Sequence, residues 1–571
     1  YKDGWRDLKK LDLNMNVLMS LAVTGALLIG QWPEAAMVMV LFNLSEAVEA
    51  RSLYRARAAI SGLLRLSPET ATARQDDGSW AETPADQVAV GQRVRVRPGE
   101  RVSLDGRVAA GASTVNQSPI TGESRPVEKT VGDMVFAGSI NESGSFEFTV
   151  TAARGDSTLA RVVRAVEEAQ ARRAPIERFV DRFARVYTPA ILALAIMTAV
   201  LPPLALGGQW LAWTYKALVL LMVACPCALV ISTPVTIVGG LTAAARRGVL
   251  IKGGAFLETG RKLTWLALDK TGTLTTGRPE LAAFQPWGQA DPERSRRLAA
   301  SLAARSDHPV SKAIAAAAVK ENVPLLDVEQ FAARPGLGVS GRVGGEDVHL
   351  GNRRLMHSRG VCSPELEKCL DGYEARGHSV VGLMDGGGVL ALFAVADGLK
   401  ANSREAVADL KALGIKTVML SGDNGSVARQ AAAASGVDSF RAELLPQDKA
   451  GIIAELQQEG PVGRVGDGIN DAPARAQADV GFAMGAAGTD TAIETADVAL
   501  MDDDLQKLPD FIRLSRATHR LLRQNISLAL GIKAAFLALT FLGRTTMWMA
   551  VFADMGVSLL VVANGLRMLR K

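Results

Sequence analysis

The chain alternates between apolar and polar stretches, and this alternation predicts its architecture. Six apolar segments stand out, at residues 15–31, 33–50, 187–207, 215–241, 526–543 and 546–566. About 20 consecutive apolar residues suffice for a helix to cross the hydrocarbon core of a bilayer. We therefore expect an α-helical transmembrane bundle of six spans, interrupted by polar insertions over roughly residues 51–186 and 242–525.

The charges at the ends of these segments predict their orientation. Arg246 and Arg247 follow the fourth segment, and Arg567, Arg570 and Lys571 follow the sixth. Cationic residues that flank a span favour the cytoplasmic side, so both insertions should be cytoplasmic. We expect an integral membrane protein in contact with lipid. The net charge of +5 fits cation-flanked spans and indicates no nucleic-acid partner.

The two insertions differ in their apolar pattern. In residues 65–155, alternation such as Val94 with Val96 and Phe146 with Phe148 predicts a small all-β domain. The second insertion has short apolar runs separated by helix-like stretches, which predict a parallel, Rossmann-like α/β sheet. These runs are residues 417–421, 464–466, 480–484 and 498–501.

The fourth apolar segment contains a proline between two cysteines. Pro226 lacks a backbone N–H and should break the helix, and irregular backbone in a membrane is tolerated where it lines a cavity or packs on protein. The break would bring Cys225 and Cys227 to an ion path, where thiolates suit metals such as Cu(I) and Zn(II). The alternative is that both thiols pack as small apolar side chains. Cys362 and Cys369 have no metal-ligand spacing, and we interpret them as ordinary free thiols.

A second segment with distinctive chemistry is Leu-Ala-Leu-Asp-Lys-Thr-Gly-Thr-Leu-Thr at residues 266–275. A short apolar strand ends on Asp269, and ligands of open α/β sheets bind at the carboxyl ends of strands. A carboxylate in that position can accept a phosphoryl group and form an aspartyl-phosphate. Thr271 and Gly272 would offer hydroxyl and backbone donors to phosphate oxygens. An exposed polar turn is the alternative interpretation.

Together, these two segments resemble the P-type ATPases, specifically the heavy-metal (type IB) branch. Further motifs follow in family order: Thr-Gly-Glu-Ser at 121–124, Ser-Asp-His-Pro at 306–309, Ser-Gly-Asp-Asn at 421–424 and Val-Gly-Asp-Gly-Ile-Asn-Asp at 465–471. The resemblance spans nearly the whole chain. It implies an ATP-driven metal exporter that forms a phosphoprotein, with actuator, phosphorylation and nucleotide-binding domains.

The resemblance also implies catalytic roles for individual residues. Asp269 would accept the phosphoryl group, and Lys449 would supply a point charge to it. Glu123 would position the water that hydrolyses the aspartyl-phosphate. Mg²⁺ would be held by Asp269, the Thr271 carbonyl and Asp467, since hard oxygen ligands suit this ion.

An ATP site is implied between the two phosphorylation segments. His308, Gly336, Gly338 and Asn352 would line the adenosine pocket, where glycines allow the backbone to approach a ligand closely. The sequence departs from the family pattern at Ala303, because a glutamate usually stands five residues before the histidine. We therefore expect adenine recognition to be weaker or to use another residue.

Two ionisable residues in the last two segments bear on the choice of metal. Counting along the segments predicts similar depths for Lys533, Asp554, Cys225 and Cys227. Two thiolates and one carboxylate would carry three negative charges, which a divalent ion and Lys533 cancel, whereas Cu(I) prefers an all-sulfur set. Lys533 and the Asp-Met-Gly run at 554–556 resemble the zinc/cadmium/lead-transporting subgroup of the branch, and the Asn-Tyr and Met-x-x-Ser-Ser motifs of the copper subgroup are missing from these segments. The alternatives are a structural Lys533–Asp554 ion pair and a Cu⁺ exporter of the same design.

Two glutamates lie towards the ends of the second segment. Glu34, near the outer end, could accept metal leaving the thiolates, and Glu46, near the cytoplasmic end, could serve metal entry. Charged residues at helix ends that reach for water explain both positions equally well. A membrane-anchored metal sensor with a phosphatase domain is a third function, but Glu123 together with Asp269 favours a complete phosphorylation cycle.

These observations divide the chain into an amphipathic end with spans 1–2 (1–51), an actuator domain (52–175), spans 3–4 (176–245), a phosphorylation domain (246–278 and 394–518), an α+β nucleotide-binding domain (279–393) and spans 5–6 (519–571). We expect a metal-binding domain and two further helices to have preceded Tyr1. We also expect a monomer in the plasma (inner) membrane of a bacterium. The sequence does not rank Zn²⁺, Cd²⁺ and Pb²⁺.

Overall fold

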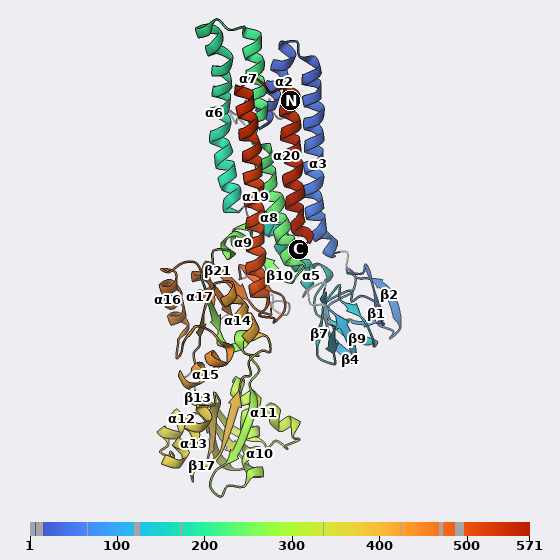
Figure 1. Cartoon of the computed structure of the whole chain (residues 1–571). Coiled ribbons are helices and arrows are strands. Elements are labelled where there is room, and N and C mark those ends of the chain that lie inside the picture. The colour runs from blue at the N-terminus through green and yellow to red at the C-terminus, as the bar shows by residue number, and fades with distance from the viewer. Residues whose placement is uncertain are drawn as a thin grey trace.

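A computed structural model of the chain has a helical bundle at one end and β-rich domains at the other (Figure 1). The structure describes residues 6, 9, 15–64, 67–118, 126–171, 174–334, 336–423, 425–466, 472–485 and 496–570. The bundle contains α2 (Met15–Leu28), α3 (Trp32–Leu64), α6 (Pro175–Leu206), α7 (Trp210–Val223), α8 (Cys227–Ala245), α19 (Lys507–Phe541) and α20 (Met547–Leu566).

The prediction of six spans is not confirmed. In the described part of the chain, the helices long and apolar enough to cross a membrane are four: Pro175–Leu206, Trp210–Ala245, Lys507–Phe541 and Met547–Leu569. Helix α2 has only 14 residues, about 21 Å of helix against a hydrocarbon core of about 30 Å. The apolar half of α3 is followed by Glu46, Glu49 and Arg51. Both helices nevertheless pack on the bundle, α2 on α7 and α3 on α20.

The predicted helix break at Pro226 is confirmed. Helix α7 ends at Val223, and α8 begins at Cys227. All residues from Ala217 to Leu229 are buried, so the irregular turn lies inside the protein. Such a turn is tolerated at membrane depth because neighbouring helices surround it.

Helix α19 connects the soluble part to the bundle without interruption over 35 residues. Its first turns carry buried apolar residues such as Leu508 and Phe511, which belong to the core of the phosphorylation domain. Its later turns pack on α8 and α20. One rigid element therefore joins the sheet around Asp269 to the helices around Pro226 (Figure 1).

The first insertion folds into antiparallel sheets, as its alternating pattern predicts. One sheet has the order β2-β1-β3-β9-β4-β7, and a smaller one has the order β6-β5-β8. Phe146 and Phe148 are buried in the apolar core of this domain. The elements are β1 (Thr70–Arg74), β2 (Trp80–Pro84), β3 (Arg93–Val96), β4 (Gly106–Gly111), β5 (Ser113–Asn116), β6 (Val127–Lys129), β7 (Met134–Val135), β8 (Ile140–Asn141), β9 (Phe146–Val150) and α5 (Thr158–Ala171).

The second insertion contains the predicted parallel sheet, of order β10-β22-β21-β20-β11-β18-β19, in which only the edge strand β10 runs antiparallel to its neighbour among the described strands. Strand β11 is central, and it pairs in parallel with β18 and β20. Its elements are β10 (Val249–Ile251), α9 (Gly254–Gly260), β11 (Trp265–Asp269), α14 (Ser403–Ala412), β18 (Lys416–Leu420), α15 (Gly425–Ser435), β19 (Ser439–Arg441), α16 (Pro446–Leu456), β20 (Val462–Gly466), α17 (Ala472–Gln477), β21 (Val480–Ala483) and β22 (Val498–Leu500).

A separate α+β unit is inserted after β11. Its antiparallel sheet has the order β12-β17-β16-β15-β14-β13. An isolated antiparallel bridge, Thr275 to Leu399, joins the chain segments that lead into and out of the unit. The elements are β12 (Glu280–Pro286), α10 (Pro292–Ala303), α11 (Pro309–Lys320), β13 (Val328–Arg334), β14 (Gly338–Val343), β15 (Glu346–Gly351), α12 (Arg353–Ser358), α13 (Pro364–Glu374), β16 (Ser379–Met384) and β17 (Val389–Ala396).

Candidate phosphorylation, nucleotide and metal sites

Asp269 ends the central strand β11, at the edge of the sheet where ligands of such folds bind. Asp269 is only 8% exposed. Lys449, at the start of α16, lies with Nζ 2.8 Å from Asp269 Oδ1. The structure therefore brings the proposed acceptor and the proposed point charge into direct contact.

Arg464 is a third member of this site that sequence reasoning missed. It lies on β20 opposite Ala267 of β11, so its side chain extends along the strand towards the end of the sheet. The guanidinium donates to Asp269 Oδ1 at 3.1 Å and to the Ala267 carbonyl at 3.3 Å. The side chain is fully buried. An arginine inside an apolar strand, just before the Gly-Asp-Gly segment, was the available signal.

The loops around Asp269 are tied together by lysines. Gly272 has φ +70°, a conformation that favours glycine. Lys400 donates to the Gly272 carbonyl at 2.7 Å and to Asp503 at 2.6 Å. Lys270 forms an ion pair with Asp423, in the predicted Ser-Gly-Asp segment. Two of the motif segments, 266–275 and 421–423, thus meet at one edge of the sheet, with Thr271 exposed to solvent there.

The four predicted nucleotide residues, His308, Gly336, Gly338 and Asn352, line one cavity of about 270 Å³. Ser306 and Gly351 line it as well. His308 caps α11 by accepting from the Val310 N–H at 3.3 Å. Asn352 caps α12 and donates to the Gly336 carbonyl at 2.9 Å. Ala303 is fully buried in the apolar core beneath and does not line the cavity.

The break in the bundle assembles the residues predicted for the transported metal. Ligand atoms of Cys225, Cys227 and Asp554 all lie within 4.8 Å of one another. Lys533 on α19 lies 2.6 Å from Asp554 Oδ1 on α20. Its ammonium also contacts the Cys225 carbonyl and lies 3.4 Å from the Val223 carbonyl. Lys533 therefore binds both the carboxylate and the carbonyls that the helix break leaves free.

The two cysteines beside Pro226 are oxidised in the structure. Cys225 and Cys227 are joined by a disulfide bond, which the sequence analysis did not expect. A disulfide sulfur carries no charge, and the thiolate is the form that binds metal. Metal binding by these two sulfurs would therefore require the reduced form. The other two cysteines are free, and burial raises the pKa of the Cys362 thiol to about 11.

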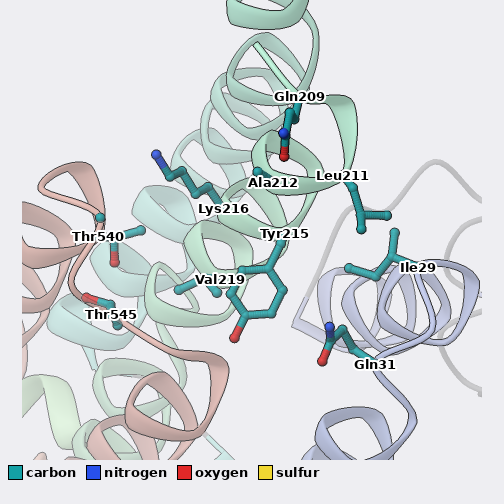
Figure 2. Close-up of a pocket in the computed structure, with 11 residues that line it drawn as sticks. Ile29, Gln31, Gln209, Leu211, Ala212, Tyr215, Lys216, Val219, Thr540 and Thr545 are labelled. Carbon is teal, nitrogen blue, oxygen red and sulfur yellow. The ribbon is translucent and has the colours of Figure 1, made fainter.

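A cavity of about 410 Å³ opens at the end of the bundle away from the soluble domains (Figure 2). In Figure 2, the Tyr215 side chain of α7 lies between Val219 and Gln31, whereas Lys216 extends away from Gln31, on the side of Thr540. The Gln31 amide lies 3.1 Å from the Glu34 carboxylate, so Glu34 adjoins this cavity. Among the described residues, no hydrogen bond or ion pair joins Glu34 or Glu46 to the Cys225 group, and Glu46 is exposed.

Two predicted catalytic residues, Glu123 and Asp467, lie outside the described residues. Their roles as water-positioning base and magnesium ligand remain predictions from the resemblance. The described strands β5 and β20 end shortly before them.

Fold and sites define a membrane-embedded phosphotransfer enzyme. Residues 65–167 match the P-type ATPase actuator domain, and residues 263–479 match the haloacid dehalogenase-like hydrolases. The chain is 44% identical to a probable cadmium-transporting ATPase of Staphylococcus aureus (strain MRSA252), covering all of this chain and 79% of the relative. It is 43% identical to a zinc/cadmium/lead-transporting P-type ATPase of Escherichia coli (strain K12), over 98% of this chain and 75% of the relative.

Solved structures agree with these matches. A zinc-transporting PIB-type ATPase in an E2.Pi state aligns with a TM-score of 0.65 and 41% identity, over all of this chain and 92% of the other. The chain belongs to the heavy-metal branch of the P-type ATPases. It is an integral membrane ATPase.

Proposed function

We propose that this protein exports Zn²⁺, and also Cd²⁺ and Pb²⁺, from the cytoplasm across the plasma membrane of a bacterium. The observation that carries the choice of a divalent ion is the contact between Lys533 and Asp554, 2.6 Å, beside the two sulfurs. A reduced site would hold two thiolates and a carboxylate, which suits a divalent borderline metal better than Cu(I). The names of the relatives, cadmium-transporting and zinc/cadmium/lead-transporting, support the same choice.

Phosphoryl transfer would use one particular oxygen of Asp269. Lys449 and Arg464 both contact Oδ1, so Oδ2 would attack the γ-phosphorus of ATP while the bond to the β-phosphate breaks and ADP leaves. Mg²⁺, when bound, would neutralise charge on the transferred group. The Asp269 carboxylate and the backbone carbonyl of Thr271, an exposed residue, would offer the hard oxygen ligands that Mg²⁺ prefers. Asp467 is the third expected ligand.

The remainder of the cycle rests on the resemblance. Glu123 would position the water that cleaves the aspartyl-phosphate, and His308 with its neighbours would bind the adenosine. Glu46 would serve entry of the ion, and Glu34, next to the outer cavity, would receive it on release. We propose a monomer with the domain boundaries given above. Exposed leucines on the bundle, such as Leu204 and Leu560, support direct contact with lipid.

The test is the ATPase activity of the purified, reduced protein titrated with Zn²⁺, Cd²⁺, Pb²⁺ and Cu⁺. We expect stimulation by the divalent ions and none by Cu⁺. The control is Asp269→Asn, which should be inactive with every metal because an amide is no nucleophile. Stimulation by Cu⁺ alone, or stimulation by divalent ions that survives Asp554→Ala, would overturn the proposed selectivity.

A further inference from the structure

A second group of metal-ligating side chains lies in the nucleotide-binding unit, far along the chain from the membrane site. The turn between α12 and α13 brings together His357, Cys362 and Glu367, whose ligand atoms all lie within 4.8 Å of one another. His357 Nε2 is 2.9 Å from Glu367 Oε1. His357 is exposed, and the other two residues are half-buried, so an ion in solution can reach the group.

The backbone that carries these three side chains is fixed independently of any ion. Gly360 has φ +68° at the end of α12, and Ser363 caps α13 by accepting from the Leu366 N–H at 3.2 Å. Leu355 and Leu366, one from each helix, are buried in the same apolar cluster. Only side-chain rotations are therefore needed to bring a sulfur, a nitrogen and an oxygen to the bonding distances of about 2.0–2.3 Å that zinc requires.

The surrounding charge favours a cation. Arg353 forms ion pairs with Glu367, with Asp371 at 2.8 Å and with Glu374 at 3.2 Å. One guanidinium thus faces three carboxylates, and the cluster carries an excess of two negative charges before Cys362 loses its proton. A divalent ion bound to a Cys362 thiolate would reduce this excess to one.

We propose that His357, Cys362 and Glu367 bind a divalent zinc-type ion, Zn²⁺ or Cd²⁺, at a site separate from the one in the membrane. A thiolate, an imidazole and a carboxylate are ligands that Zn²⁺ takes together, with water as the fourth ligand. On binding, the sulfur–metal bond forms and the thiol proton leaves to solvent. The proposal does not depend on which metal is transported.

The site also has a defined relation to the nucleotide cavity. Helix α12 is six residues long, with Asn352 of the cavity as its N-cap and His357 in its last turn. A metal bound at the α12–α13 turn would therefore lie one short helix away from the Asn352 side chain, which donates to the Gly336 carbonyl at the cavity.

The chain offers a clean spectroscopic test, because it contains only four cysteines. In the full chain carrying Cys225→Ala and Cys227→Ala, any thiolate-to-cobalt charge-transfer absorption after addition of Co²⁺ must come from Cys362 or Cys369. We expect such a band at one equivalent of Co²⁺. Adding Cys362→Ser should abolish it, whereas adding Cys369→Ser, seven residues away, should leave it unchanged.

Equilibrium binding of Zn²⁺ to the same variants gives a second readout. We expect His357→Ala, a change at an exposed position, to weaken Zn²⁺ binding by tenfold or more without affecting folding. Absence of the cobalt band while Cys362 is intact would overturn the proposal. A band that survives Cys362→Ser, or Zn²⁺ binding unchanged in His357→Ala, would do so as well.

Discussion

At the scale of single residues, the main feature of the proposed phosphorylation site is that two cationic side chains, Lys449 and Arg464, contact the Asp269 carboxylate. The sequence motif identifies Asp269, and family order identifies Lys449, because both stand in recognisable segments. Arg464 could not be identified in this way, since a lone arginine in a strand has many explanations. Its partner is set by the pairing of β20 with β11, which only the fold provides.

We predict that Arg464→Met slows formation of the phosphoenzyme from ATP by roughly 10- to 100-fold, because a hydrogen bond to a charged group contributes about 1.5–3 kcal/mol. The affinity for ATP should not change, since Arg464 does not line the nucleotide cavity. Rapid-quench phosphorylation with labelled ATP, alongside equilibrium binding of ATP, measures both quantities. Arg464→Lys keeps the charge and should be intermediate; a wild-type phosphorylation rate in Arg464→Met would refute the role.

The disulfide between Cys225 and Cys227 leads to a second prediction at this scale. We expect oxidised protein to lack metal-stimulated ATPase activity and to recover it on treatment with a reductant, because only thiolates bind the ion. Activity before and after reduction, at saturating Zn²⁺, tests this directly. The Cys225→Ser/Cys227→Ser variant should stay inactive under both conditions. Equal activity of the oxidised and reduced wild-type protein would argue against metal ligation by these sulfurs.

At the scale of elements, the sequence predicted strands better than spans. Residues 464–466 were expected as a strand and are found in β20, and residues 480–484 are matched by β21 within one residue. Buried parallel strands have short, continuous apolar runs, which are easily recognised. Helices α2 and α3 have apolar stretches like those of the four longer spans. Hydropathy alone does not show how far such a helix continues or what it packs against.

The contact between α19 and α20 provides the prediction at the element scale. Removing one partner of a buried ion pair costs about 3–5 kcal/mol because the other charge is left uncompensated. Asp554→Ala should therefore weaken binding of divalent metal and leave Lys533 without its carboxylate. Lys533→Ala should keep metal binding but slow metal release, since no internal cation then competes for Asp554.

Equilibrium metal binding and transport into vesicles, on both single variants and the double variant, measure the coupling. Effects of the two substitutions that simply add would contradict an energetic link between them. Full transport by Lys533→Ala would likewise remove Lys533 from the release step. Neither result would bear on phosphorylation at Asp269.

At the scale of the whole molecule, two chain segments that meet at the Thr275–Leu399 bridge connect the nucleotide unit to the phosphorylation sheet, and Gln430 of α15 donates to the Ala375 carbonyl of that unit at 2.6 Å. Lys400 stands where the chain returns, and it binds the Gly272 carbonyl and Asp503. We predict that Lys400→Met slows phosphorylation by ATP more than phosphorylation by inorganic phosphate, because the second reaction does not require the nucleotide unit to be aligned. Comparing the two phosphorylation levels tests this; equal losses would indicate local damage around Asp269.

Helix α19 has a mechanical consequence. Lys507 is anchored in the phosphorylation domain by the Arg247 carbonyl, at 2.5 Å, and by Asp502, at 3.2 Å. With a rise of 1.5 Å per residue, it stands about 39 Å along the axis from Lys533. If the helix tilts by about 5° about Lys507, Lys533 moves by about 3 Å. That displacement is as large as the Lys533–Asp554 contact distance of 2.6 Å, so a tilt of α19 by this angle relative to α20 would separate the two side chains.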